Sequence, residues 1–142
     1  MYINMKMREI LESMKLLSDL SRLRILMLLA GNELCVCQIM GVLGMSQPLV
    51  SRNLSLLHKG GFLDARRDGK MIFYMIRKKP RKMQRLLLNV VIDLLKGNRI
   101  TAEDLVSLGE CQEFQKKTGK CGMDTYLAYM KKRRTRKRGA AS

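Results

Sequence analysis

The chain has 142 residues, of which 46% are hydrophobic, and its 28 Lys and Arg against 12 acidic residues give a net charge of +16. One small core and a polyanionic partner are therefore expected. No apolar run approaches the roughly 18 residues of a membrane span, and no signal-peptide core is present, so we expect a cytoplasmic protein without a membrane partner.

The first 58 residues have the periodicity of helices. Apolar residues recur at spacings of three and four, and Gly or capping residues separate the runs. The expected helices cover 5–17, 20–30, about 36–43 and 47–58.

The third and fourth of these helices are joined by a tight turn at Gly44, and Ser46 is placed to cap the fourth. Two helices joined by a Gly-containing turn, the second exposing small polar and Arg residues, indicate a helix-turn-helix. The fourth helix is then the DNA-reading helix. Its exposed, DNA-binding residues are expected to be Gln47, Ser51, Arg52 and Asn53.

A β-hairpin follows the recognition helix. Residues 62–67 and 71–76 flank Asp68-Gly69, which is a strong two-residue turn signal. The hairpin forms a wing, and the basic residues of its tip are expected to bind backbone phosphates or the minor groove: Arg66, Arg67 and Lys70.

The segment after Pro80 predicts a long helix over 83–95 with a regular apolar stripe. Such a stripe requires a partner, and the helix over 5–17 offers a similar face. We expect a homodimer built on the first and last long helices, which presents two recognition helices to two half-sites of duplex DNA. The predicted fold is thus mainly α with a small β-hairpin, a winged helix-turn-helix.

The C-terminal third has weaker signals. A short helix is expected near 101–105, an extended loop over 109–125, and a basic, disordered tail over 131–142. The predicted units are 1–98, the winged helix-turn-helix DNA-binding and dimerisation domain; 99–130, an extension carrying Cys111 and Cys121; and 131–142, the tail.

Two of the four cysteines, Cys35 and Cys37, stand one residue apart at the start of the third expected helix, in front of the recognition helix. In a reducing cytosol such a pair favours a ligand or sensor role over a disulfide framework. Soft thiolates select soft, thiophilic ions. Residues at i and i+2 do not face each other in a regular helix, so binding of one ion by both requires an irregular or unwound helix start. Such a distortion would shift the recognition helix.

Several motifs together resemble the ArsR family of metalloregulatory repressors over about residues 10–96. They are Glu33 to Cys37, Ser46-Gln47-Pro48 with Val50-Ser51-Arg52 and Leu54, Gly60-Gly61-Phe62-Leu63, and Arg67-Asp68-Gly69-Lys70 with Tyr74. The resemblance implies a dimeric repressor of a resistance operon that leaves its operator when As(III) or Sb(III) binds. The Cys-x-Cys element also occurs in the branch that answers to Cd(II) or Pb(II).

Two positions depart from the arsenite-responsive pattern, because Met40 replaces a third cysteine and Gln38 an acid. The third thiolate is then expected from Cys111 or Cys121, of the same or the partner subunit, with Cys111 favoured by its shorter tether. A His and acid zinc site on the last long helix is disfavoured, since the only histidine is His58.

Other interpretations stay open. Cys37 with Cys111 could form a sulfide- or oxidant-responsive dithiol switch on the same fold. A thiol oxidoreductase or a metal-storage protein would explain neither the recognition helix nor the basic wing, and the Cys-x-Cys spacing is not the Cys-x-x-Cys of redox enzymes. We therefore expect no enzymatic activity.

Overall fold

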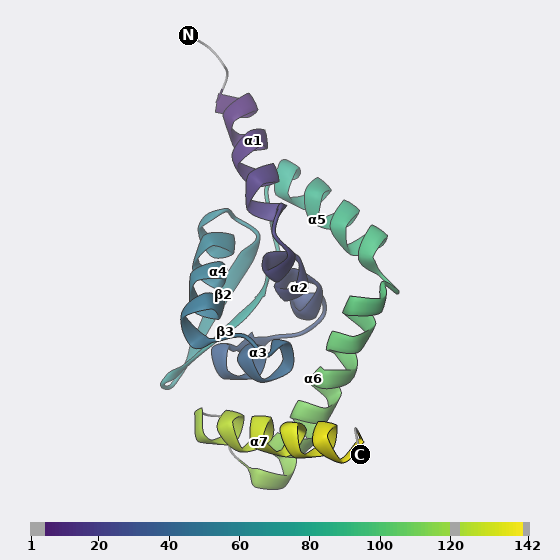
Figure 1. Cartoon of the computed structure of the whole chain (residues 1–142). Helices are drawn as coiled ribbons and strands as arrows, with labels where there is room; N and C mark the ends of the chain where they lie inside the picture. Colours follow the sequence, from purple (N-terminus) through teal and green to yellow (C-terminus); the bar gives the residue numbers. More distant parts are fainter. Residues whose placement is uncertain (1–4, 120–122, 141–142) are drawn as a thin grey trace.

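The computed structural model describes residues 5–119 and 123–140, and its helices and strands follow one another as in Figure 1. The elements are α1 (Met5–Leu17), α2 (Leu20–Leu29), β1 (Leu34–Cys35), α3 (Val36–Leu43), α4 (Gln47–Lys59), β2 (Leu63–Asp68), β3 (Met71–Ile76), α5 (Lys82–Leu95), α6 (Arg99–Thr118) and α7 (Met123–Ala140). None of the helices in this part of the chain combines the length and apolar character needed to cross a bilayer.

The predicted helices up to α5 and the predicted hairpin are confirmed. Asp19 caps α2 by accepting a hydrogen bond from the Arg22 amide at 3.0 Å, and Ser46 caps α4 by accepting one from the Leu49 amide at 3.4 Å. Gly44 ends α3 with a φ of +68°, a left-handed conformation that glycine adopts without strain. The winged helix-turn-helix prediction is therefore confirmed.

Strand β1 was not expected from the sequence. It pairs with β3 in an antiparallel sheet of order β1-β3-β2, with Leu34 opposite Tyr74 and Cys35 opposite Phe73. The first cysteine of the Cys-x-Cys motif is thus part of the same sheet as the wing.

The main core lies between α2, α3, α4 and the start of the wing. Its largest fully buried side chains include Ile25, Leu26, Leu54, Leu57 and Phe62. Burial of these side chains positions the recognition helix against the rest of the domain.

The extended loop predicted over 109–125 is wrong for residues 109–118, which belong to α6, and for residues 123–125, which belong to α7. Asn98 caps α6, since its Oδ1 accepts a hydrogen bond from the Ile100 amide at 3.0 Å. The face of α6 that packs on α2 and α3 consists mainly of small and polar residues, so it has no apolar stripe for periodicity to detect. Its buried residues are Thr101, Asp104, Ser107, Leu108 and Cys111.

Helix α7 contains residues 131–140, in place of the expected disordered tail. It packs below α3 and passes the lower end of α6 (Figure 1). Tyr129 anchors it, being buried and packed against Phe114 of α6 with 5.7 Å between ring centroids. This aromatic contact and the hydrogen bonds of Arg133, described below, are interactions that composition alone does not predict.

Candidate functional site

The Cys-x-Cys motif lies at the junction of a strand and a helix. Cys35 is the N-cap residue of α3, with an extended backbone (φ −90°, ψ 168°), whereas Cys37 lies in the first turn of the helix. The two thiols therefore belong to different backbone conformations. Cys35 thus lies just outside the regular helix, and Cys37 lies within it.

Three thiols come from β1, α3 and α6. Cys35 is 1% exposed and Cys111 is 5% exposed, while Cys37 is half-buried. Cys121, the fourth predicted ligand, lies outside the described residues. The structure thus describes three of the four predicted ligands.

Cys35 lies within electrostatic range of both other thiols. The pKa of Cys111 is raised to about 11, first by burial and then by a charge on Cys35, and Arg133 partly offsets this rise. The pKa of Cys37 is also raised, first by burial and then by Cys35. At neutral pH Cys37 and Cys111 are therefore protonated, and they become ligands only by losing protons.

Within residues 5–119 and 123–140, no three Cys, His, Asp or Glu side chains converge closely enough to form a metal site. Met40, which replaces the third cysteine of the arsenite-responsive pattern, is buried in the core. Binding of an ion by the three described thiols therefore requires a movement of α3 or α6.

Gln38 connects the motif to α6. Its Oε1 accepts a hydrogen bond from the Cys35 amide at 3.0 Å, and its Nε2 donates one to Gln115 Oε1 at 2.9 Å. Gln38, which replaces the acid of the arsenite-responsive pattern, thus stabilises the start of α3 and connects it to α6, the helix that carries Cys111.

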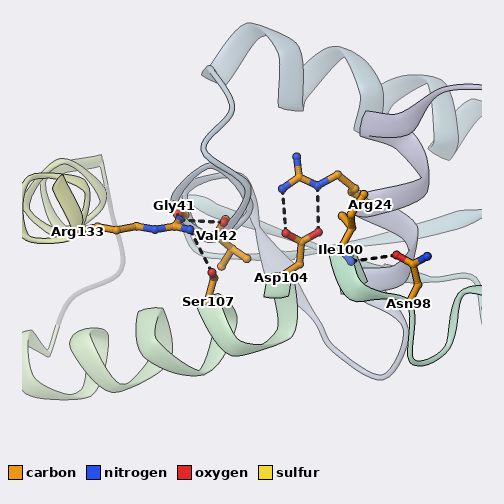
Figure 2. A network of polar contacts seen from close by, with 8 residues as sticks. All are labelled: Arg24, Gly41, Val42, Asn98, Ile100, Asp104, Ser107 and Arg133. Carbon is orange, nitrogen blue, oxygen red and sulfur yellow. Dashed lines mark hydrogen bonds and ion pairs between the residues drawn. The ribbon is translucent and has the colours of Figure 1, made fainter. Parts of the chain in front are cut away.

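Two further polar contacts fix α6 and α7, and neither was expected from the sequence (Figure 2). Arg24 of α2 forms a bidentate ion pair with Asp104, at 3.0 and 2.9 Å. This contact raises the pKa of Arg24. Arg133 donates to the Gly41 and Val42 carbonyls at the end of α3 and to Ser107 Oγ. The position of Arg24 directly before the buried run 25–29 of α2 was the available signal for a partner.

The recognition helix exposes three of its four predicted contact residues, Gln47, Ser51 and Arg52. Asn53 is 3% exposed, so the prediction that it is exposed is wrong. It falls on the buried face with Val50 and Leu57, at helical spacing. Its Oδ1 accepts a hydrogen bond from Arg22 Nη1 at 3.2 Å, which makes it part of the α2–α4 contact.

The wing residues Arg66, Arg67 and Lys70 are exposed, as expected. The guanidinium of Arg66 pairs with Glu33 at 3.1 Å and lies over the Phe73 ring, 5.1 Å from its centroid. Glu33 precedes β1 and Phe73 is the partner of Cys35 in the sheet. Arg66 is therefore directly connected to the thiol motif.

A winged helix-turn-helix with an exposed polar recognition helix and a basic wing defines the class of DNA-binding transcriptional regulators. Residues 19–65 match the family described as "Bacterial regulatory protein, arsR family". The chain is 37% identical over 91 residues to the arsenic resistance transcriptional regulator ArsR1 of Pseudomonas putida, covering 61% of this chain and 71% of that protein. The chain belongs to the arsR family of bacterial regulatory proteins and is a transcriptional repressor rather than an enzyme.

Shorter matches reach two other relatives, of which the chain spans about half the length. It is 44% identical over 63 residues to the arsenical resistance operon repressor of Escherichia coli, covering 44% of this chain and 54% of that protein. It is 41% identical over 64 residues to the cadmium resistance transcriptional regulatory protein CadC of Listeria innocua, with the same two coverages, 44% and 54%.

Solved structures agree with the fold. The transcriptional repressor BigR of Xylella fastidiosa aligns with a TM-score of 0.57 and 26% identity, covering 66% of this chain and 90% of that one. A homodimeric winged helix-turn-helix domain of Mycobacterium bovis, described as a possible ArsR-family regulator, aligns with a TM-score of 0.54 and 30% identity, covering 66% and 83%.

Proposed function

We propose that the protein is a homodimeric, thiol-based repressor that binds operator DNA and is released when As(III) or Sb(III) binds Cys35, Cys37 and Cys111. One observation carries the proposal: Cys35 lies at the junction of β1 and α3, α3 itself carries Cys37, and α3 packs against α6, which carries the buried Cys111. Cys121 remains a candidate ligand in place of Cys111.

The chemistry of the donors supports a soft ion. Thiolates select thiophilic ions over the abundant hard ones, and three thiolates suit trivalent arsenic or antimony. Cys37 and Cys111 would each lose a proton on binding, so their raised pKa values set a threshold that only a strongly thiophilic ion overcomes. Two relatives named as arsenic or arsenical resistance regulators support the same choice.

The coupling to DNA runs through two contacts of the motif. Recruitment of Cys111 would pull α6 and the start of α3 together, and α3 packs directly on α4. It would also displace β1, which is paired with β3 and connected through Glu33 to Arg66 of the wing. A hundredfold loss of operator affinity requires the ion to favour the released form by about 3 kcal/mol.

Exposed apolar faces on α1 and α5 support dimerisation through these helices. The four residues on α1 recur at spacings of three and four, and the three on α5 recur at a spacing of four. A monomer would leave both faces in water. They are Met7, Ile10, Leu11 and Met14 on α1, and Leu86, Val90 and Leu94 on α5. The structural neighbour from Mycobacterium bovis, which is described as homodimeric, supports a homodimer.

DNA contacts divide between the recognition helix and the wing. Gln47, Ser51 and Arg52 are exposed on α4 and would contact base edges in the major groove. The wing residues Arg66, Arg67 and Lys70 would contact backbone phosphates or the minor groove.

The test measures release of the reduced protein from duplex DNA. The duplex is first selected from a random library by its binding to the protein. Arsenite, cadmium and a persulfide donor are titrated separately, and fluorescence anisotropy of the labelled duplex is followed. Release by arsenite at the lowest concentration is expected. Release by cadmium at a lower concentration than arsenite would favour a cadmium-responsive repressor, as the name of the CadC relative indicates. Release by the persulfide donor alone would exclude both ion-responsive functions.

A further inference from the structure

We propose that α7 binds the DNA backbone through a basic stripe made of Lys131, Arg134 and Arg138. This inference rests on the proposed operator binding and adds a contact surface outside the recognition helix and the wing. The ligand is the phosphate backbone of duplex DNA.

Seven of the eight residues in 131–138 are basic, but the helix divides them between different faces. The three residues of the basic stripe stand at i, i+3 and i+7 and therefore share one face. Lys132 and Arg136, at i and i+4, share another. Arg133 points inward, toward the end of α3 (Figure 2).

The two exposed faces have different surroundings. Lys132 lies over the Phe114 ring, with Nζ 5.4 Å from the centroid, and Arg136 borders a hollow shared with Glu110 and Glu113 of α6. Acidic side chains thus lie beside the Lys132 and Arg136 face. The basic stripe is exposed, and none of its residues forms an ion pair with any residue in the described part of the chain.

The basic stripe borders the turn of the helix-turn-helix. Arg134 lines a hollow together with Leu43 and Gly44, two residues before the N-cap of the recognition helix. In helix-turn-helix complexes the start of the recognition helix enters the major groove and the preceding helix crosses the backbone. Charges beside this turn are therefore near the phosphates that flank the groove.

Arg133 fixes the basic stripe in this position. Its guanidinium donates hydrogen bonds to the Gly41 and Val42 carbonyls, at 3.4 and 3.3 Å, so α7 is attached to the C-terminal end of α3. From Lys131 to Arg138 the helix rises about 10 Å, which corresponds to roughly three phosphates along one strand. Three positive charges without ion-pair partners among the described residues, spread over about 10 Å of a fixed helix, match the spacing of roughly three backbone phosphates.

The experiment compares two variants that remove the same charges. Lys131→Gln with Arg134→Gln changes the basic stripe, and Lys132→Gln with Arg136→Gln changes the other face. Each removes one Lys and one Arg from the full chain. Duplex affinity is measured over a range of KCl concentrations, and the slope of log affinity against log salt is compared with that of the parent.

The stripe variant is expected to lower the magnitude of the slope by about 0.9 for each phosphate that it no longer neutralises, and the control variant to keep the parent slope. The charge-conserving pair Lys131→Arg with Arg134→Lys should also keep it, which separates the effect of charge from that of a perturbed helix. Equal slopes for the stripe and control variants would overturn the proposal, even with operator binding and arsenite release intact. A parent without salt-dependent duplex binding would overturn the proposed function as well.

Discussion

Gln38 Nε2 donates a hydrogen bond to Gln115 Oε1 at 2.9 Å, which joins the first turn of α3 to α6. The same Gln38 side chain accepts a hydrogen bond from the Cys35 amide. One residue therefore connects the backbone of the Cys-x-Cys motif with the helix that carries Cys111.

Substitution of Gln38 and of Gln115 should separate the contributions of the two Gln38 hydrogen bonds to stability. Gln115→Leu is expected to lower the free energy of unfolding by about 1 kcal/mol, the value of one ordinary hydrogen bond. Gln38→Leu should cost more, because it also removes the acceptor for the Cys35 amide at the start of α3. Urea unfolding of both variants measures the difference. Equal destabilisation would mean that the bond to the Cys35 amide contributes nothing.

The Arg24–Asp104 ion pair should be a principal attachment of α6. Asp104 is 6% exposed, so Arg24→Leu leaves a nearly buried carboxylate without its partner. Because Arg24 itself is partly exposed, the expected loss of stability is roughly 1–3 kcal/mol. Thermal and urea unfolding give the measurement.

Two controls accompany Arg24→Leu. The second substitution Asp104→Leu should restore part of the stability, since no unpaired charge remains. Glu103→Gln removes the exposed pair between Glu103 and Arg99 on the same helix and should cost less than about 1 kcal/mol. A comparable destabilisation by Glu103→Gln would contradict a special role for Asp104.

Asn53 and Ser51 should have opposite phenotypes. Asn53→Ala removes the acceptor for Arg22 between α2 and α4 and is expected to destabilise the fold by about 1–2 kcal/mol while preserving sequence preference. Ser51→Ala is expected to leave stability within about 0.5 kcal/mol and to weaken specific binding relative to non-specific binding. Unfolding curves and competition with unrelated duplex test the pair. A changed sequence preference in Asn53→Ala, with normal stability, would contradict its structural role.

The stability of the reduced protein should depend on Cys111 at alkaline pH. The pKa of this thiol is raised from 9.0 to about 11 by burial, so between these values the unfolded chain loses the proton while the folded chain keeps it. The contribution is fully present below about pH 9 and is lost as the pH rises to about 11. The difference in unfolding free energy between the parent and Cys111→Ala should therefore shrink across this interval. Parallel pH curves would contradict a buried, protonated thiol.

The sequence was sufficient to predict the helices from α1 to α5 and the β2–β3 hairpin, because apolar periodicity and the positions of Gly and Pro agree there. For α6 it indicated only a short helix near 101–105 and missed the rest, because the buried face contains Thr101, Asp104 and Ser107. The burial of Asp104 depends on Arg24, 80 residues earlier in the chain. Such long-range pairs leave no local periodic signal.

The candidate site was predicted in part. The spacing of Cys35 and Cys37 indicated a ligand pair at a helix start, and the structure has Cys35 as the N-cap. Strand β1 is only two residues long and exists through its pairing with β3, so no local pattern could indicate it. The prediction that Asn53 is exposed was wrong because it relied on the polarity of the side chain. The spacing from Val50 and Leu57 places Asn53 on the buried face of α4.

The most direct test of the central claim is the number of sulfur ligands around arsenic bound to the reduced protein, measured by X-ray absorption spectroscopy. Three sulfur ligands are expected in the parent and in Cys121→Ser, and two in Cys111→Ser. Three sulfur ligands in Cys111→Ser, or two in the parent, would contradict a site formed by Cys35, Cys37 and Cys111.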